Sequence, residues 1–219
     1  GIPKDSNTLY FPKTINNGEK EIATGIDSLF VNVSASLILY EARELVLYNK
    51  YIGHDIFRLI LEPPFRPPTI ISIHKDGTQV WLTAKQLNRY PEFLELQVMR
   101  MVPKYSDLKT LEQTSFSGSF NSDSIIYPNR HADIKIYKER QLGLKHWRQF
   151  EKLIARFKFW EKNPSEKHKP YLDGTSWILE GHTKNKYWFI ERHNPTEYFY
   201  DCGIYLIELS KLQLSGKYY

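Results

Sequence analysis

The strongest constraint on the fold of this chain is the segment Asp173–Pro195, in which two alternating runs meet at a short polar turn. Successive side chains of a strand point to opposite faces, and Asn tolerates the left-handed backbone that a two-residue turn needs. With Lys184-Asn185 as that turn, the spacing predicts a β-hairpin. Its one face pairs Leu179 with Ile190, Gly181 with Trp188 and Trp177 with Arg192, and its other face carries Ile178, Glu180, Tyr187 and Phe189.

A second hairpin is predicted at Thr69–Lys85. Asp76-Gly77, a pair favoured in type I′ turns, separates two strand-like runs there. Pairing Lys75 with Thr78 places aliphatic side chains together on one face, which we expect to be the core face. They are Ile71, Ile73, Val80 and Leu82, with Ile73 opposite Val80 and Ile71 opposite Leu82.

The remaining elements follow from apolar periodicity. Helices are predicted over Ser28–Glu44, Leu144–Glu161 and Glu197–Leu212. Further strands are predicted at Ile56–Glu62, Phe93–Val102 and His131–Tyr137. This order indicates an α+β fold, in which an antiparallel sheet is built from hairpins and helices pack mainly on one face.

Composition indicates one folded domain. No linker-like stretch separates two cores, so a single domain over 1–219 is predicted, with a polar arm at 1–22 and a long loop or insertion at 104–130. Aromatic residues form 15% of the chain, and the net charge of +5 is spread along it, which argues against a nucleic-acid partner. No apolar run approaches the roughly 20 residues of a membrane-spanning helix.

The residue types that often catalyse reactions or bind metals do not form a cluster in the predicted fold. Cys202, the single cysteine, lies on the apolar face of the last predicted helix, where we expect a packed core thiol. Gly203 beside it indicates close packing against a neighbour. His182 and His193 lie on different strands of the hairpin with no cysteine near, and His168 lies in a Lys/Pro-rich loop, so no set of three or four metal ligands is predicted. We assign no catalytic residue, metal or cofactor.

Asp173, Glu180 and Arg192 are the most suggestive polar set. In a small hydrolase-like enzyme, the two carboxylates would form an acid/base pair oriented by the guanidinium. The predicted register, however, sends Glu180 and Arg192 to opposite faces. We favour a structural interpretation, in which Asp173 caps the strand entry and the other two pair with backbone or other side chains.

Two candidate binding surfaces remain. The helix 144–161 carries a basic stripe, which is the ordinary solvated face of an amphipathic helix and alternatively a site for an anionic polymer. Its residues are Lys145, Arg148, Lys152 and Arg156. Trp81 and Tyr187 are predicted on sheet faces opposite the main core, where uncovered rings would form an aromatic platform for a protein or a glycan.

The Asp173–Pro195 hairpin also carries a pattern: DG-x-x-W-x-L-E-G, a short turn, K-Y and an Arg. The matching residues are Asp173, Gly174, Trp177, Leu179, Glu180, Gly181, Lys186, Tyr187, Arg192 and Pro195. Over Leu144–Leu212 the chain thereby resembles a family of uncharacterised bacterial proteins that are predicted to be secreted or in the envelope. His193 and Asn194 stand where that family has Trp-Ser. The resemblance implies a fold and an envelope location, and no activity.

The leading hypothesis is a non-enzymatic binding or interaction protein of a bacterial cell envelope, because aromatics are abundant and no catalytic set converges. The alternatives are the hydrolase-like enzyme with Asp173 and Glu180, and the binder of an anionic polymer through the basic helix. The chain begins with Gly1 rather than Met, which is compatible with removal of a signal peptide. A periplasmic or extracellular location is therefore favoured over a cytoplasmic one.

Overall fold

The computed structural model of the protein describes residues 14–16, 21–23, 36–48, 51–64, 66–91, 131–164, 174–184, 186–193, 195 and 197–214. Contacts between residues divide the chain into two units, 1–90 with 132–219, and 91–131. Every helix and strand given below belongs to the first unit. The predicted strand at 93–102 and the predicted loop at 104–130 lie outside the described residues.

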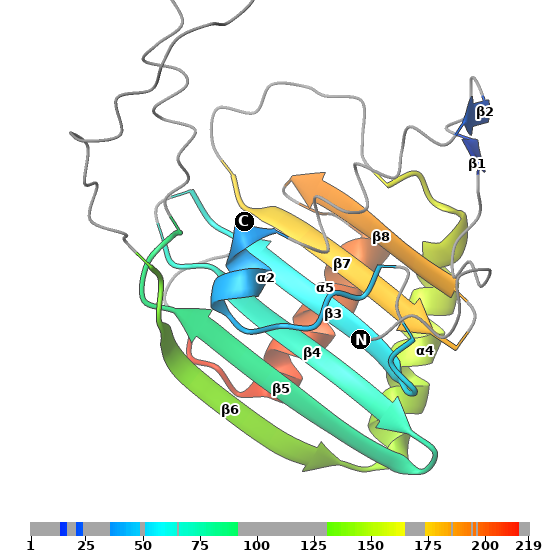
Figure 1. Cartoon of the computed structure of the whole chain (residues 1–219). Helices are drawn as coiled ribbons and strands as arrows, with labels where there is room; N and C mark the ends of the chain where they lie inside the picture. The colour runs from blue at the N-terminus through cyan, green and yellow to red at the C-terminus, as the bar shows by residue number, and fades with distance from the viewer. Residues whose placement is uncertain are drawn as a thin grey trace, which may run out of the picture. The chain divides into compact units, whose positions relative to one another are not determined.

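A six-stranded antiparallel sheet forms the centre of the first unit (Figure 1). Its strands lie in the order β6-β5-β4-β3-β7-β8. They are β3 (Asp55–Glu62), β4 (Thr69–Asp76), β5 (Gln79–Leu87), β6 (Ile134–Leu142), β7 (Ser176–Thr183) and β8 (Lys186–His193). Within and just after the predicted polar arm 1–22, β1 (Thr14–Asn16) and β2 (Glu21–Ala23) pair in a separate two-stranded sheet. The predicted antiparallel sheet built from hairpins is confirmed.

The predicted register is correct in one of the two hairpins and wrong in the other. In β7–β8 the predicted register is confirmed, with Leu179 opposite Ile190 and Thr183 opposite Lys186. In β4–β5 the predicted faces are correct but the register is wrong by two residues, because Ile73 lies opposite Leu82. The reason is the turn: Asp76 pairs with Gln79, so the loop residues are Gly77-Thr78. Gly77 has φ +54°, and type II′ turns require glycine at this first loop position.

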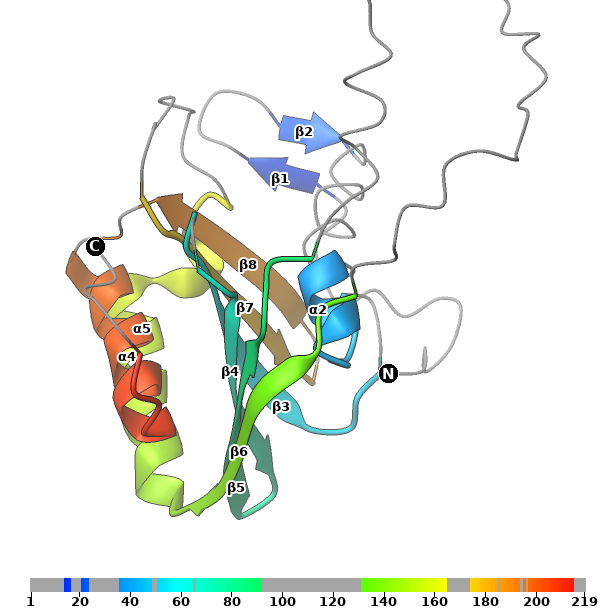
Figure 2. The ribbon, with the colours of Figure 1, turned by 90° about the vertical axis from the view of Figure 1, so that its left-hand side faces the viewer.

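Two long helices cover one face of the sheet, α4 (Leu144–Phe157) and α5 (Glu197–Ser210), as the edge-on view in Figure 2 shows. The short α2 (Leu37–Glu41) lies on the other face. The two long helices and the short one therefore lie on different faces of the sheet. In the part of the chain that the structure describes, no helix is long and apolar enough to cross a membrane.

The predicted helix ends were wrong in a consistent way. The helix predicted to Glu44 ends at Glu41, the one predicted to Glu161 ends at Phe157, and the one predicted to Leu212 ends at Ser210. A basic residue with a positive φ follows each end: Arg43 at 54°, Lys158 at 56° and Lys211 at 52°. A left-handed residue breaks the helical hydrogen-bond pattern, so each helix stops there. A 3₁₀ turn, Phe159–Glu161, continues after α4, and residues 24–35 lie outside the described residues.

The core lies between the sheet and the two long helices, and aromatic rings fill it. Phe57 of β3 packs against Phe150 of α4, with ring centroids 5.3 Å apart. Gly181 leaves room for the rings of Phe57 and Phe159, since a Cβ there would lie 2.7 Å from the first and 2.8 Å from the second. Gly203 of α5 does the same for Trp177, at 2.2 Å, so the predicted close packing at Gly203 is confirmed.

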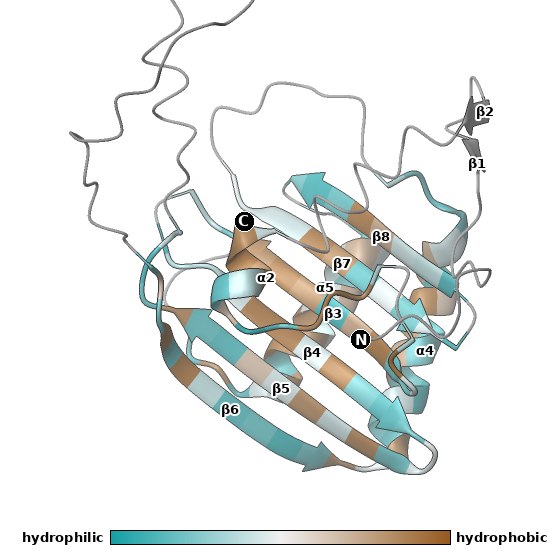
Figure 3. Ribbon diagram, viewed as in Figure 1, coloured by the Kyte–Doolittle hydropathy of each residue, from teal (hydrophilic) through white to brown (hydrophobic). Residues whose placement is uncertain are grey.

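The opposite face of the sheet, here called the α2 face, carries a different set of side chains. Strand alternation and register place six polar or aromatic residues on it: Arg58, His74, Trp81, Lys85, Glu180 and Tyr187. Figure 3 shows hydrophobic residues concentrated in β3 and β4 and a more hydrophilic β6. Two of these residues, Arg58 on β3 and His74 on β4, therefore stand on the most apolar strands of the sheet.

Candidate ligand-binding face of the sheet

A buried ion pair lies at the centre of the α2 face. Arg58 of β3 and Glu180 of β7 are direct cross-strand partners, and both are 0% exposed. The Arg58 Nε and Nη2 atoms donate to Glu180 Oε2 at 2.8 and 2.5 Å. The Tyr187 hydroxyl donates to the other oxygen, Oε1, at 2.6 Å. Burial alone would lower the pKa of Arg58, but the charges of Glu180 and Glu44 raise it, so the guanidinium stays charged.

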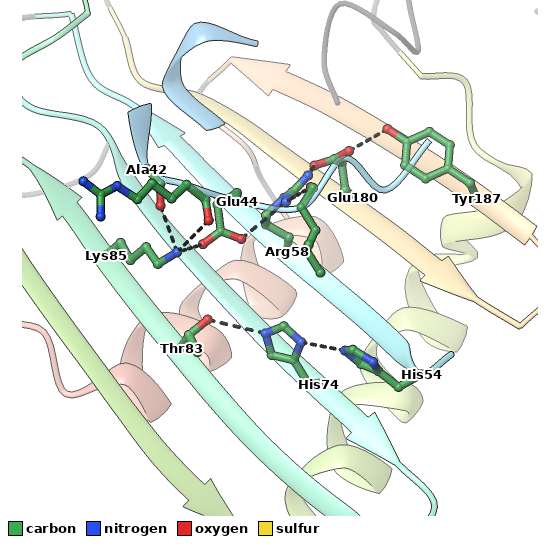
Figure 4. Close-up of polar contacts among 11 residues, drawn as sticks. Ala42, Glu44, His54, Arg58, His74, Thr83, Lys85, Glu180 and Tyr187 are labelled. Atoms are coloured by element: carbon green, nitrogen blue, oxygen red, sulfur yellow. Dashed lines mark hydrogen bonds and ion pairs between the residues drawn. The ribbon is translucent and has the colours of Figure 1, made fainter. Parts of the chain in front are cut away.

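The same network holds the segment 42–47 onto the sheet (Figure 4). Arg58 Nη1 donates to the Leu45 carbonyl oxygen at 2.8 Å, and Lys85 Nζ donates to the Ala42 carbonyl oxygen at 2.9 Å. Glu44 lies between the two cations, 2.7 Å from Lys85 Nζ and 3.4 Å from Arg58 Nη1. Each buried charge therefore has an opposite charge beside it, which offsets much of its desolvation cost.

Two histidines and a tryptophan lie beside this network. His54 Nε2 and His74 Nδ1 are 3.2 Å apart, and His74 Nε2 is 3.4 Å from Thr83 Oγ1. The His74 ring stacks on Trp81 with centroids 4.8 Å apart and an interplanar angle of 4°. Burial, with smaller contributions from His54 and the nearby cations, lowers the pKa of His74 to about 3. The ring is therefore neutral at pH 7.

Two cavities lie next to the histidine pair, and each is lined by one of the two rings. One of about 320 Å³ lies at the end of the sheet and is lined by Tyr51, Gly53, His54, Asp55, Lys75, Asp76, Gly77, His182 and Lys184. The other, of about 150 Å³, lies beneath the segment 42–47 and includes Arg58, His74, Trp81, Thr83 and Lys85. His54 lines the first cavity and hydrogen-bonds His74, which lines the second.

A pair of carboxyl groups lies at the opposite end of the α2 face. Tyr90 Oη donates to Glu62 Oε2 at 3.2 Å, and Ser176 Oγ donates to Glu191 Oε1 at 3.1 Å. Burial, together with the charge of Glu191, raises the pKa of Glu62 to about 7. Neither of the two cavities includes these residues. They therefore form a polar cluster outside both cavities.

Of the predicted polar set Asp173, Glu180 and Arg192, the structure places Glu180 and Arg192 on opposite faces of the sheet. Glu180 faces the α2 side opposite Phe189, whereas Arg192 pairs with Trp177 on the other face. Arg192 donates through Nη2 to the Asn163 carbonyl oxygen at 3.0 Å. Both residues therefore make the structural contacts that the sequence suggested. Asp173 lies outside the described residues.

The two predicted binding surfaces differ in exposure: the aromatic residues are half-buried or buried, and the basic residues of α4 are exposed. Trp81 and Tyr187 share the α2 face, but Trp81 is half-buried and Tyr187 is buried. They do not form an open aromatic platform. The basic stripe of α4 is exposed at all four positions, Lys145, Arg148, Lys152 and Arg156. The Arg156 guanidinium also lies 4.1 Å from the centre of the Tyr198 ring on α5.

The sequence interpretation missed Arg58, Glu44 and the His54–His74 pair. A signal for Arg58 was available, because an arginine within the apolar strand 56–62 requires a buried anionic partner. No group of three His, Cys, Asp or Glu residues is placed to hold a metal ion among the residues described. Comparisons with family models, curated proteins and solved structures each return no match to this chain.

Proposed function

We propose that this protein is a non-enzymatic binding protein of a bacterial cell envelope, and that it binds a glycan at the larger cavity, at the end of the sheet. One observation carries the proposal: the Tyr51 ring, 46% exposed, borders a hollow lined by Asp55, Lys75 and Lys184. A sugar presents apolar ring faces and a rim of hydroxyl groups. A half-exposed aromatic ring beside charged donors and acceptors complements both features.

Binding to purified peptidoglycan sacculi and to soluble envelope oligosaccharides tests the proposal. We expect co-sedimentation with the sacculi or binding to at least one oligosaccharide, and a loss of about tenfold or more in Tyr51→Ala. Tyr198→Ala is the matched control, because Tyr198 is 40% exposed on α5, on the other side of the sheet. Absence of binding to every glycan, or equal loss in both variants, would contradict the proposal.

The hydrolase alternative has less support. One of its two proposed carboxylates, Glu180, is 0% exposed; its Oε2 accepts from Arg58 and its Oε1 accepts from Tyr187. A general acid or base must reach the proton that it transfers, directly or through one water. Glu180 in this arrangement is a structural anion at the centre of the sheet.

Binding of an anionic polymer by α4 is the second candidate function. The exposure of all four cations of the stripe favours it. The test is the affinity for heparin or a teichoic acid as a function of salt. A steep decline of log K with log salt, reduced in Arg148→Gln/Lys152→Gln, is expected if the stripe binds polyanions. A response to salt that is flat, or equal in the variant and the wild type, would remove this candidate.

A further inference from the structure

The outer surface of the helix layer carries two stripes of opposite charge. Figure 2 shows α4 and α5 side by side on the outside of the sheet. The exposed charged side chains of α4 are basic with one exception, and those of α5 are all acidic. The basic stripe consists of Lys145, Arg148, Lys152 and Arg156, and the acidic stripe of Glu197, Asp201 and Glu208. A solvated helix surface commonly mixes both signs three or four residues apart, so this segregation is a distinct feature.

The other charges near the two helices lie away from the stripes. Glu151 is the exception on α4, and it projects about 140° around the helix from Arg156, because successive residues turn by about 100°. Arg156 faces α5, where it stacks on Tyr198, so Glu151 lies on the far flank of α4. The remaining cations stand at the helix ends: Lys158 and Lys211 follow α4 and α5, and Lys138 and Arg140 of β6 donate to the carbonyl oxygens of Lys211 and Leu209.

Contacts between the helices show that they are antiparallel. Near the start of α4, His146 Nδ1 lies 3.2 Å from the hydroxyl oxygen of Tyr205. At the end of α4, the Phe157 ring packs on Phe199 with centroids 5.2 Å apart. Residues late in α5 therefore lie beside residues early in α4, and the two stripes run next to each other along their whole length.

Opposite charges thereby lie at the same level along the helices. Lys145 is level with the turn of α5 that carries Glu208, and Lys152 is level with the turn that carries Asp201. No ion pair joins the two stripes in the described part of the chain. The charges of both stripes are therefore available to an outside partner.

A second copy of the same chain supplies both complementary stripes at once. In a two-fold dimer the same surface of each copy meets the other. If the axis runs between α4 and α5, parallel to them, a half-turn places α4 of each copy over α5 of the other. This rotation keeps every residue at its level along the axis, so Lys152 faces Asp201 of the other copy, and Lys145 faces Glu208. An axis perpendicular to the helices would instead place α4 over α4 and oppose like charges.

The size of this surface indicates a weak dimer. Helices of 14 residues are about 21 Å long and about 10 Å wide, so the two together cover about 400 Å² per copy. This area is below that of most stable interfaces, and each exposed ion pair adds little affinity. Ile204, half-buried between Asp201 and Glu208, and Tyr198, 40% exposed, add a small apolar contribution. The attraction therefore depends on low salt.

We propose that this protein forms a weak, salt-sensitive homodimer in which α4 of each copy packs on α5 of the other, basic stripe against acidic stripe. The dimer does not depend on the proposed glycan site, so Tyr51→Ala should leave it unchanged. It uses the basic stripe that an anionic polymer would need, but it also needs the acidic stripe, which such a polymer would not contact.

Sedimentation equilibrium of the full chain tests the proposal. At about 50 mM NaCl we expect a dimer with a dissociation constant of about 10–100 µM. At about 500 mM NaCl the constant should be at least about tenfold larger, because salt screens exposed charges. A monomer at every protein concentration up to about 500 µM, or the same dissociation constant at both salt concentrations, would overturn the proposal.

Reversal of one charge in each stripe locates the interface. Lys152→Glu and Asp201→Lys each oppose like charges twice in their own homodimer, so each should raise the dissociation constant about tenfold or more. An equimolar mixture of the two variants restores both opposite pairs and should dimerise within about threefold of the wild type. This recovery occurs between chains, so a local effect of either substitution on its own chain cannot produce it.

Glu151→Lys is the matched control for Asp201→Lys. Both substitutions change an exposed acid of the helix layer to lysine, but residue 151 lies on the far flank of α4, so its dissociation constant should stay within about twofold of the wild type. Thermal unfolding checks that every variant folds. Heparin separates the dimer from polyanion binding, because Asp201→Lys should weaken the dimer without weakening heparin binding. A mixture that dimerises no better than either variant alone, or an equal loss in Glu151→Lys, would refute the assignment.

Discussion

Arg58 and Glu180 face each other directly across β3 and β7, and two guanidinium nitrogens of Arg58 donate to a single carboxylate oxygen of Glu180. The residues are 122 positions apart in the sequence. Tyr187 occupies the second oxygen, and Arg58 also donates to the carbonyl oxygen of Leu45. The pair therefore joins β3 to the β7–β8 hairpin and to the segment 42–47, and Arg58 lines the smaller cavity.

Breaking this pair should be strongly destabilising. Arg58→Met leaves the Glu180 carboxylate buried without its cation, so we expect a loss of about 3–5 kcal/mol in the free energy of unfolding, measured by urea denaturation. The double variant Arg58→Met/Glu180→Leu removes the uncompensated charge and should recover more than half of the loss. Lys75→Met breaks the partly exposed Asp55–Lys75 pair and should cost less than about 1 kcal/mol. A double variant as unstable as Arg58→Met would show that the charge is not the cause.

Substitution of Gly203 should disturb the packing of Trp177. A Cβ at residue 203 would lie 2.2 Å from the Trp177 ring, so Gly203→Ala should lower stability by about 1–3 kcal/mol despite alanine's better helix propensity. Gly143→Ala is the control, because the nearest atom to its Cβ is 3.8 Å away. In Gly203→Ala/Trp177→Leu the two losses should not add, as thermal unfolding would show. Full additivity would mean that the two residues do not collide.

Acid should destabilise the protein through His74. Its folded pKa of about 3 lies below the ordinary value of 6.5, so the unfolded chain binds more protons between these values. The stability present above pH 6.5 is therefore lost as pH falls toward 3, by about 1.4 kcal/mol per pH unit. At pH 4 the loss from this group should be about 3 kcal/mol. It is measured as the difference between the stability curves of the wild type and His74→Gln.

His131→Gln, at an exposed histidine, is the control for this pH dependence and should follow the wild-type curve. Parallel curves for the wild type and His74→Gln from pH 7 to pH 4 would show that His74 takes up a proton in the folded protein as readily as in the unfolded chain.

The thiol of Cys202 should be unreactive in the native protein. Cys202 is buried on α5, and burial raises its pKa to about 12, so the thiolate population at pH 8 is very small. Labelling with a disulfide-exchange reagent should be at least about 1000-fold slower in buffer than in denaturing urea, and its rate should follow the unfolding equilibrium. The chain has one cysteine, so the signal has a single source. Rapid labelling of the native protein would mean that this end of α5 opens locally.

Local patterns were sufficient to predict the hairpins and the helix faces. The register of β7–β8 follows from one polar two-residue turn and from alternation, both of which are local. Trp147, Phe150 and Ile154 recur at helical spacing and are buried, as the pattern of α4 predicted. The helix ends were harder to predict from the sequence. Arg43, Lys158 and Lys211 have the left-handed backbone that is usual for glycine, and no local sequence signal marks it at these residues.

By itself the sequence determined the two hairpins and the apolar face of each, and Arg58 within the apolar β3 was an unused signal for a buried anion. Only the tertiary structure decided that this anion is Glu180, that Glu44 and Lys85 join it, and that His74, which lines one cavity, meets His54, which lines the other. The physical reason is the range of the interactions. Alternation and turn geometry act between near neighbours, whereas pairing β3 with β7 depends on how the whole chain buries its apolar faces.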